Sequence, residues 1–265
     1  MIFKNFRRVL HAFIFSFSIF GSAMECFSIK TLQSHIDSLQ TGDWFVVDID
    51  DTIITPQAMM FRPASPYCTF IDGIKRKSNI ADIVSAWRLS RKVMLVEQEW
   101  PTIIEALKKR GVVVIALTQM HSGKFGKIPS MENWRADELR KLGITFNPFS
   151  TDTVETLIDT DEPATLFQGI LFTGSHSKSD VLNSFIAKYG IPPKILFFDD
   201  RLHHVESLGE LCSKLNIIYE GYHYLATTQL PYSAEENHGA IQTQLILDGQ
   251  WLEDEDVQKK QVSHG

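Results

Sequence analysis

The sequence predicts an α/β protein built on a doubly wound parallel sheet. Short, fully apolar segments alternate with segments of helical periodicity along most of the chain. The apolar segments are continuous, which is typical of strands that helices cover on both faces. Strand–helix alternation specifies a parallel sheet, whose ligands bind beyond the carboxyl ends of the strands.

The first half of the chain supplies two strands and their helices. A helix is expected over 31–40, where apolar residues have helical spacing, and an apolar strand follows at 44–47. A second helix over 101–110 has proline in its first turn and Gly111 past its end. The run 112–117 then forms a buried strand.

The second half repeats this pattern. Gly143 closes a helix, and Gly190 with Pro192 stops another whose apolar residues lie on one side. Ser233 and Glu236 form a capping box for a last helix. We expect helices over 132–142, 179–189 and 205–215, and strands over 169–172, 195–198 and 217–219.

Three stretches depart from the alternation. The segment 56–92 is long for a connection and includes a helical stretch over 80–89, so we expect it to form a small, mainly helical cap. The segment 147–167 is rich in Thr and Asp and is expected to be exposed. The acidic tail from Glu253 onward is expected to be solvated and frayed.

The amino terminus has the order of a secretory signal peptide. A basic start precedes an apolar run over 9–20 and small residues over 21–23. This predicts a signal peptide over 1–23, cleavage near Ala23, and a secreted or periplasmic mature domain over 24–265. An uncleaved anchor or a first core helix is the alternative, although the run is short for a membrane span.

Composition limits the partners. The chain has 265 residues, 44% hydrophobic and 22% charged, so it can bury a sizeable core. Its formal net charge of -6 argues against nucleic acid or anionic membranes as general partners. Cys26, Cys68 and Cys212 lack metal-site spacing, although any two of them could pair in an oxidising compartment. Oligomeric state is left open.

Two acidic clusters carry the chemistry. Asp48, Asp50 and Asp51 directly follow the strand 44–47, and Asp199 with Asp200 follows the strand 195–198. Strand ends of one parallel sheet meet at one edge, where so many carboxylates repel one another unless a cation offsets them. A hard ion that takes oxygen ligands fits this set, and we expect Mg²⁺. Each cluster alone would also be consistent with an acidic loop or a helix cap.

Two further residues predict a phosphate site beside the acids. Thr118 ends the buried strand 112–117, and Lys178 opens a helix after a Gly-Ser-His-Ser turn. An ammonium and a helix N-terminus both favour an anion. Taken alone, either residue would be an ordinary strand end or surface lysine. His203 and His204 are adjacent on a helix and so are not expected to share a zinc ion.

In their order and context these residues resemble the haloacid dehalogenase (HAD) superfamily. Its four motifs would be Asp48/Asp50/Thr52, Thr118, Lys178 and Asp199/Asp200, within residues 44–224. The leader, the insertion and a carboxyl-terminal helix with Trp251 are also similar to a little-characterised family of secreted bacterial HAD-like proteins of unknown function. Motif four departs from the pattern, because Arg201 and not an acid follows Asp200.

The resemblance implies a role for each matching residue. Asp48 would attack phosphorus to form an aspartyl-phosphate, and Asp50 would act as general acid and then base. Mg²⁺ would be held by Asp48, the Asp50 carbonyl and the Asp199/Asp200 pair, while Thr118 and Lys178 would bind phosphoryl oxygens. The expected activity is hydrolysis of a small phosphate monoester by a secreted enzyme. The alternative is a secreted binding or effector protein of this fold with little or no turnover.

Overall fold

The computed structural model describes residues 23–62, 65, 79–149, 153–232 and 236–262. Nearly all of the predicted signal peptide, Cys68 and Ser233 lie outside these residues. The strands are β1 (Met24–Cys26), β2 (Trp44–Val47), β3 (Ile54–Pro56), β4 (Val93–Leu95), β5 (Val113–Thr118), β6 (Glu155–Ile158), β7 (Ala164–Phe167), β8 (Ile170–Phe172), β9 (Lys194–Asp199) and β10 (Ile218–Tyr224). The α-helices are α1 (Gln33–Ser38), α3 (Ile80–Ser90), α4 (Trp100–Lys109), α5 (Met131–Arg140), α6 (Lys178–Tyr189), α7 (Leu202–Lys214), α8 (Glu236–Leu247) and α9 (Asp254–Val262).

The predicted α/β fold is confirmed. An eight-stranded sheet has the order β1-β10-β9-β2-β5-β8-β7-β6. Neighbours from β1 to β8 in this order are parallel, and β6 and β7 are antiparallel additions at the β8 edge. The strand β2 lies in the middle, between β9 and β5. The sheet is therefore mixed, with a parallel centre.

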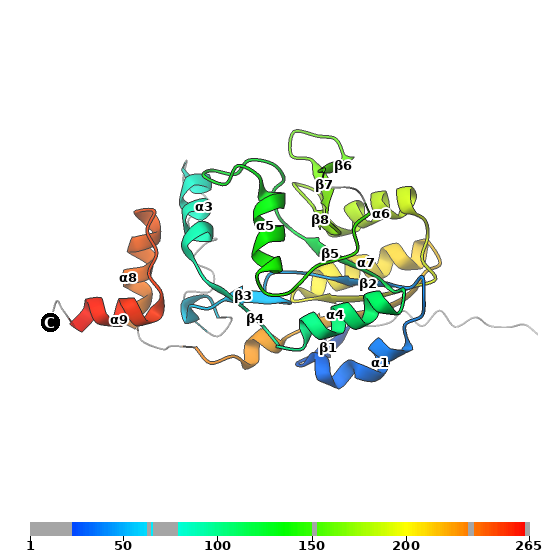
Figure 1. Cartoon of the computed structure of the whole chain (residues 1–265), viewed down its shortest axis with the longest axis horizontal. Helices are drawn as coiled ribbons and strands as arrows, with labels where there is room; N and C mark the ends of the chain where they lie inside the picture. The colour runs from blue at the N-terminus through cyan, green and yellow to red at the C-terminus, as the bar shows by residue number, and fades with distance from the viewer. Residues whose placement is uncertain (1–22, 63–64, 66–78, 150–152, 233–235, 263–265) are drawn as a thin grey trace, which may run out of the picture.

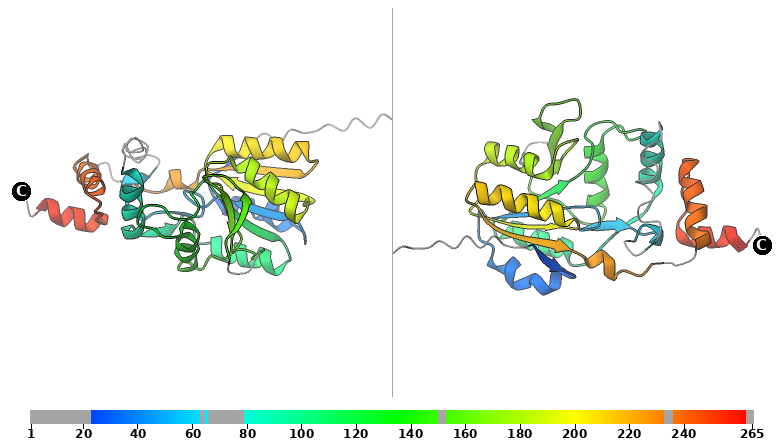
Figure 2. Two further views of the ribbon diagram at one scale, coloured as in Figure 1. Left: turned by 90° about the horizontal axis from the view of Figure 1, so that it is seen from above. Right: turned by 180° about the vertical axis from the view of Figure 1, so that it is seen from behind.

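Helices cover both faces of this sheet, as Figures 1 and 2 show. Alternate residues of β2 point to opposite cores: Phe45 and Val47 pack with α1, α4 and α5, whereas Trp44 and Val46 pack with α6 and α7. Because both faces are buried, the central strands are apolar throughout, which explains their continuous hydrophobic runs.

The predicted element boundaries need four corrections. The segment predicted as a helix over 31–40 is a 3₁₀ turn over Ile29–Leu32 followed by the short α1. The strand predicted at 217–219 extends through β10 to Tyr224. The expected exposed excursion 147–167 contributes β6 and β7 to the main sheet, and β7 is fully buried. The edge strand β1 had no periodicity to predict it, since it has only three residues.

The tail predicted to be frayed is also ordered into structure, because α9 packs with α8 beside α3 (Figure 1). We call α3, α8 and α9 the outer helices. Trp87 of α3 contacts Trp251 at a ring-centroid distance of 6.2 Å, and Glu253 accepts a hydrogen bond from the Lys92 N–H at 2.9 Å. The two ends of the segment 56–92 are joined by the antiparallel pair β3–β4. The carboxyl-terminal region therefore supports the segment predicted to be a cap.

Two cysteines are described. Cys26 and Cys212 are free, buried thiols in the cores on opposite faces of the sheet, so they do not pair with each other. Burial raises the pKa of Cys212 to about 12, which makes it a poor nucleophile. Among the residues that the structure describes, no helix is both long and apolar enough to cross a bilayer.

Candidate active site

The candidate site lies at the carboxyl ends of the three central strands. Asp48 directly follows β2, Asp199 ends β9 and Thr118 ends β5. The Asp48 N–H donates to the Phe198 carbonyl at 2.9 Å, so the end of β2 is fixed beside the end of β9. The parallel pairing that the sequence predicted therefore brings these distant residues to one edge.

Three carboxylates meet at this edge. One oxygen each from Asp48, Asp199 and Asp200 lie within 4.8 Å of one another. Asp48 and Asp199 are buried, whereas Asp200 is partly exposed. The two acidic segments are 150 positions apart in the chain, yet their carboxylates are close enough to share one cation.

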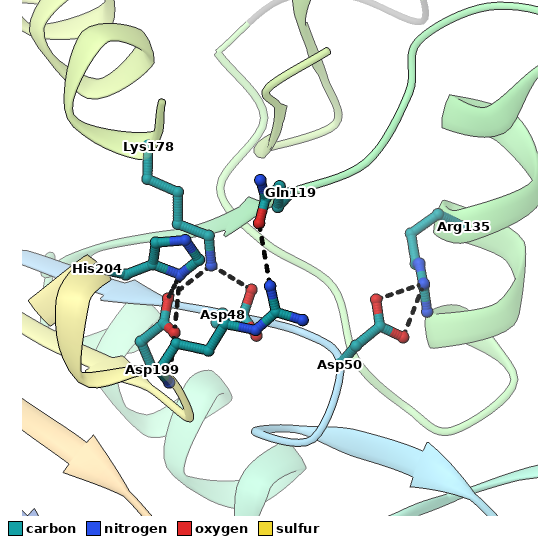
Figure 3. Close-up of polar contacts among 8 residues, drawn as sticks. Asp48, Asp50, Gln119, Arg135, Lys178, Asp199 and His204 are labelled. Atoms are coloured by element: carbon teal, nitrogen blue, oxygen red, sulfur yellow. Dashed lines mark hydrogen bonds and ion pairs between the residues drawn. The ribbon is translucent and has the colours of Figure 1, made fainter. Parts of the chain in front are cut away.

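Lys178 is the basic partner of this cluster. Ser177 caps α6 by accepting the Asp180 N–H at 3.1 Å, and Lys178 is the first residue of the helix. Its side chain is 1% exposed, and its ammonium donates to Asp48 Oδ1 and to Asp199 Oδ2, the latter at 2.6 Å (Figure 3). The cap thus directs a buried positive charge between two of the acids.

One lysine does not balance the cluster. Burial raises the pKa of Asp48 to about 7, although Lys178 opposes this shift. Burial also raises the pKa of Asp200 to about 9, and the charges of Asp48 and Asp199 add to the effect. Burial acts on Asp199 too, but the charge of Lys178 and a hydrogen bond from His204 hold its pKa below the usual value. Near neutral pH the cluster therefore favours a further positive charge.

A divalent cation would supply the positive charge that the carboxylate cluster lacks. Asp48, Asp199 and Asp200 supply the hard oxygen ligands that Mg²⁺ prefers. The partly exposed Asp200 leaves the cluster open to a hydrated ion, and Mg²⁺ usually keeps several waters. The donor set of three carboxylates, one of them on a partly exposed residue, thus suits Mg²⁺.

Asp50, predicted as a metal ligand and general acid, does not join the carboxylate cluster. The chain turns sharply after Ile49, and Asp51 has a positive φ of 59°. Arg135 of α5 donates to both Asp50 oxygens at 2.9 and 2.7 Å, and Figure 3 shows this pair set apart from Asp48. Burial acts to raise the pKa of Asp50, but Arg135 and then Arg91 hold it below its usual value. Asp50 is therefore an anion in this arrangement.

Thr118 is buried at the same edge, one strand from Asp48. Its carbonyl accepts the Met120 N–H at 3.0 Å and the Thr173 N–H at 3.1 Å, which fixes the chain as it leaves β5. Beyond it, Gln119 Oε1 accepts a hydrogen bond from Arg201 at 3.2 Å. Since β5 and β9 flank β2, this bond spans the strand end that carries Asp48.

Three residues have direct contacts here that the sequence did not predict: His204, which was considered only as a zinc ligand, and Arg135 and His223, which were not considered. His204 is buried, and its Nδ1 lies 3.1 Å from Asp199 Oδ1. Arg135 is fully buried against Asp50, and the His223 ring lies 3.0 Å from the Asp200 carbonyl. His204 follows the acid pair by one helical turn, a spacing that could have indicated the contact; the other two carry no local signal.

Known proteins show where this chain belongs. A family model described as "Protein of unknown function (DUF2608)" matches residues 25–258. An uncharacterized protein of Rickettsia prowazekii is 29% identical over 238 residues, 86% of each chain. A Chlamydia pneumoniae protein, named as a candidate outer membrane protein, is 21% identical over 245 residues, 86% of this chain and 85% of its own. An uncharacterized protein of Rickettsia felis is 28% identical over 146 residues, 51% of this chain and 49% of its own. No solved structure matches significantly.

These matches correct the assignment to the haloacid dehalogenase superfamily, and with it the narrower resemblance to secreted HAD-like proteins. The matching model covers most of the chain and describes a family of unknown function. The four short motifs are carboxylates, a hydroxyl and an amine at or near the strand ends of a parallel sheet. Many unrelated sheets of this kind carry such residues there, so the motifs do not identify a family. The chain belongs to the DUF2608 family of proteins of unknown function.

Proposed function

We propose that this protein is a Mg²⁺-dependent hydrolase of small phosphate monoesters that uses Asp48 as its nucleophile. The observation that carries the proposal is the cluster of Asp48, Asp199 and Asp200, whose oxygens lie within 4.8 Å of one another beside the buried Lys178 ammonium. Such a cluster is costly to fold, and a bound cation offsets that cost and can then attract the phosphoryl anion. Perturbed carboxylates at the carboxyl edge of a parallel sheet are also the expected position of a catalytic site.

The chain's own residues would carry each step. An Asp48 oxygen attacks phosphorus, the bond from phosphorus to the leaving oxygen breaks, and Asp48 becomes an aspartyl-phosphate. Water then attacks phosphorus, releases phosphate and regenerates the Asp48 carboxylate. Lys178 and Thr118 would bind phosphoryl oxygens throughout. Bound Mg²⁺, held by Asp48, Asp199, Asp200 and the Asp50 carbonyl, would neutralise charge on the transferring group.

Asp50 would supply and accept the proton. As general acid it must protonate the leaving oxygen, and in the second step it would take a proton from the attacking water. Its carboxylate is 42% exposed and paired with Arg135. The proposal therefore requires Asp50 to leave Arg135 and turn towards the leaving group when substrate binds.

This same pair favours a second candidate function, a binding or effector protein with little or no turnover. An ionised Asp50 locked on Arg135 would give a site that accepts Mg²⁺ and phosphate without protonating a leaving group. Such a protein would bind phosphorylated molecules and release them unchanged.

A hydrolysis assay separates the two candidates. The chain from residue 24 should hydrolyse an aryl phosphate with Mg²⁺ and lose this activity with EDTA. Asp48→Asn should lower the rate of hydrolysis by at least about a thousandfold, while the circular dichroism of the variant stays unchanged. Asp137→Asn, at an exposed position on α5, is the matched control and should keep full activity. Beryllofluoride binding that needs Mg²⁺, with no turnover of any phosphate ester, would instead establish the binding protein.

We also propose that the protein acts outside the cytoplasm. The signal-peptide pattern over 1–23, with cleavage near Ala23, supports this proposal, and so does the name of the Chlamydia pneumoniae relative. Amino-terminal sequencing of the mature protein from a bacterial host tests it. A first residue at or near Met24 is expected, and an intact Met1 would contradict it.

A further inference from the structure

A cluster of three arginines lies where α3 meets α5. Arg88 belongs to α3, Arg91 directly follows it, and Arg135 belongs to α5. The helices α3 and α5 stand beside each other, and the guanidinium of Arg88 lies 5.9 Å from the Trp134 ring of α5 (Figure 1). The cluster is thus formed by two elements that meet only in the folded chain.

Two acids are shared among these arginines. Asp50 contacts Arg135 at 2.7 Å and Arg91 at 3.7 Å. Glu138 contacts the same two arginines, at 2.6 and 3.7 Å. With three guanidinium groups and two carboxylates, one positive charge has no counter-ion within the cluster.

Arg88 carries this surplus charge. It forms no ion pair with any residue that the structure describes, and its nearest partners are the rings of Phe125, at 5.2 Å, and Trp134. One of its terminal nitrogens is buried and has no hydrogen-bond partner in the part of the chain that the structure describes. The pKa of Arg88 is lowered to about 10, mainly by burial and also by the nearby charges of Arg135 and Arg91. The residue as a whole is partly exposed, although this terminal nitrogen is buried.

The position of the cluster indicates what it would bind. Asp50 lies between Asp48 and Arg135 (Figure 3) and is the residue proposed to protonate the leaving oxygen. Groups beyond Asp50 therefore face the part of the substrate that leaves with that oxygen. A partly buried guanidinium without a counter-ion, held on two aromatic rings, is well suited to an anionic group on that part.

We propose that Arg88, supported by Arg91 and Arg135, binds a second anionic group, a phosphate or a carboxylate, on the leaving portion of the substrate. This inference rests on the proposed phosphatase site. It makes the protein selective for phosphate esters whose alcohol is itself an anion, and Arg88 is its specificity-determining residue.

Binding of unreactive phosphonates tests this proposal without turnover. Alkylphosphonates of two to five carbons would be compared by calorimetry, at saturating Mg²⁺, with chains of equal length that end in a second phosphonate or in a carboxylate. At one chain length the dianionic probe should bind about ten- to a hundredfold more tightly, because a charge-assisted contact contributes about 1.5–3 kcal/mol. Whether phosphonate or carboxylate gains more identifies the second group.

Arg88→Met should abolish this preference and leave simple alkylphosphonate binding unchanged. It leaves no buried carboxylate unpaired and removes repulsion from Arg91 and Arg135, so its Tm should equal or exceed that of the unaltered chain. Arg140→Met, on α5 but paired with Asp137 outside the cluster, is the control and should keep the preference.

The outcomes separate the two proposals. Alkylphosphonates that bind without any gain from a second anion, or a gain that survives in Arg88→Met, would overturn this inference and leave the phosphatase standing. A lower Tm in Arg88→Met with an unchanged preference would establish a purely structural arginine. If no phosphonate binds with Mg²⁺, both proposals fail.

Discussion

Replacing Asp200 by Asn should make the metal-free protein more stable and its response to Mg²⁺ weaker. The side chain keeps its shape but loses the charge that opposes Asp48 and Asp199. Without a cation the Asp200 carboxylate destabilises the folded protein by repulsion, whereas with Mg²⁺ it binds the ion. The substitution should thus raise stability in EDTA and reduce the stabilisation by Mg²⁺. This pair of opposite changes identifies a metal site more clearly than a loss of activity does.

The magnitude follows from the spacing of the carboxylates. Two like charges 4.8 Å apart repel by about 3 kcal/mol at an effective dielectric constant of about 20. Asp200 faces two such neighbours, but Lys178 and proton uptake at Asp200 recover much of this cost. Asp200→Asn should therefore raise the free energy of unfolding in EDTA by about 1–3 kcal/mol. Mg²⁺ at a hundred times its Kd should stabilise the unaltered chain by about 2.7 kcal/mol and the variant far less.

Urea unfolding of both proteins, in EDTA and in Mg²⁺, measures these differences. The exposed Asp137→Asn substitution is the control, and it should shift neither value by more than about 0.5 kcal/mol. A metal site at Asp200 would be excluded if Asp200→Asn destabilised the metal-free protein, or if Mg²⁺ stabilised the variant as much as the unaltered chain. The first outcome would mean that Asp200 makes favourable contacts, and the second that the ion binds elsewhere.

Two further substitutions test the neighbouring structure. Lys178→Met should lower the free energy of unfolding in EDTA by about 3–5 kcal/mol, because it leaves Asp48 and Asp199 without their buried ammonium. Mg²⁺ should restore part of this loss in the same urea assay. Equal losses in EDTA and in Mg²⁺ would contradict a Mg²⁺ site at these carboxylates. Gly126→Ala should lower the Tm and speed proteolysis at 119–128, because φ is 54° and a Cβ would clash with the Ala81 carbonyl and the Ser85 hydroxyl. An unchanged Tm would mean that the contact of this loop with α3 is loose.

The sequence predicted the centre of the site because that centre is built from strands buried on both faces. The runs at 44–47 and 195–198 are apolar throughout, so both strands were identifiable and their acids had to emerge at one edge. Lys178 was predictable for a related reason. Its helix has a capping serine and a one-sided apolar pattern, which fixed where the helix starts.

The orientation of Asp50 was not predictable in this way. In an extended chain, side-chain alternation would put Asp50 on the same side as Asp48. The chain instead turns at Asp51, and Asp50 pairs with Arg135, 85 positions away. The pair β3–β4 also joins segments that are distant in the chain, Ile54–Pro56 and Val93–Leu95, through strands of only three residues. Contacts of this kind leave no period in the sequence, because each depends on where the whole fold brings two surfaces together.

Asp50 links the two proposals physically. It is held by Arg135 and Arg91, and these are the arginines beside Arg88. An anion bound at Arg88 would offset the surplus positive charge there and compete with Asp50 for the same guanidinium groups. Weaker ion pairs between Asp50 and these arginines would favour hydrolysis, because Asp50 must turn towards the leaving oxygen to protonate it. A substrate with a second anionic group would thus promote the side-chain movement that its own hydrolysis requires, whereas a simple phosphate ester would leave Asp50 on Arg135.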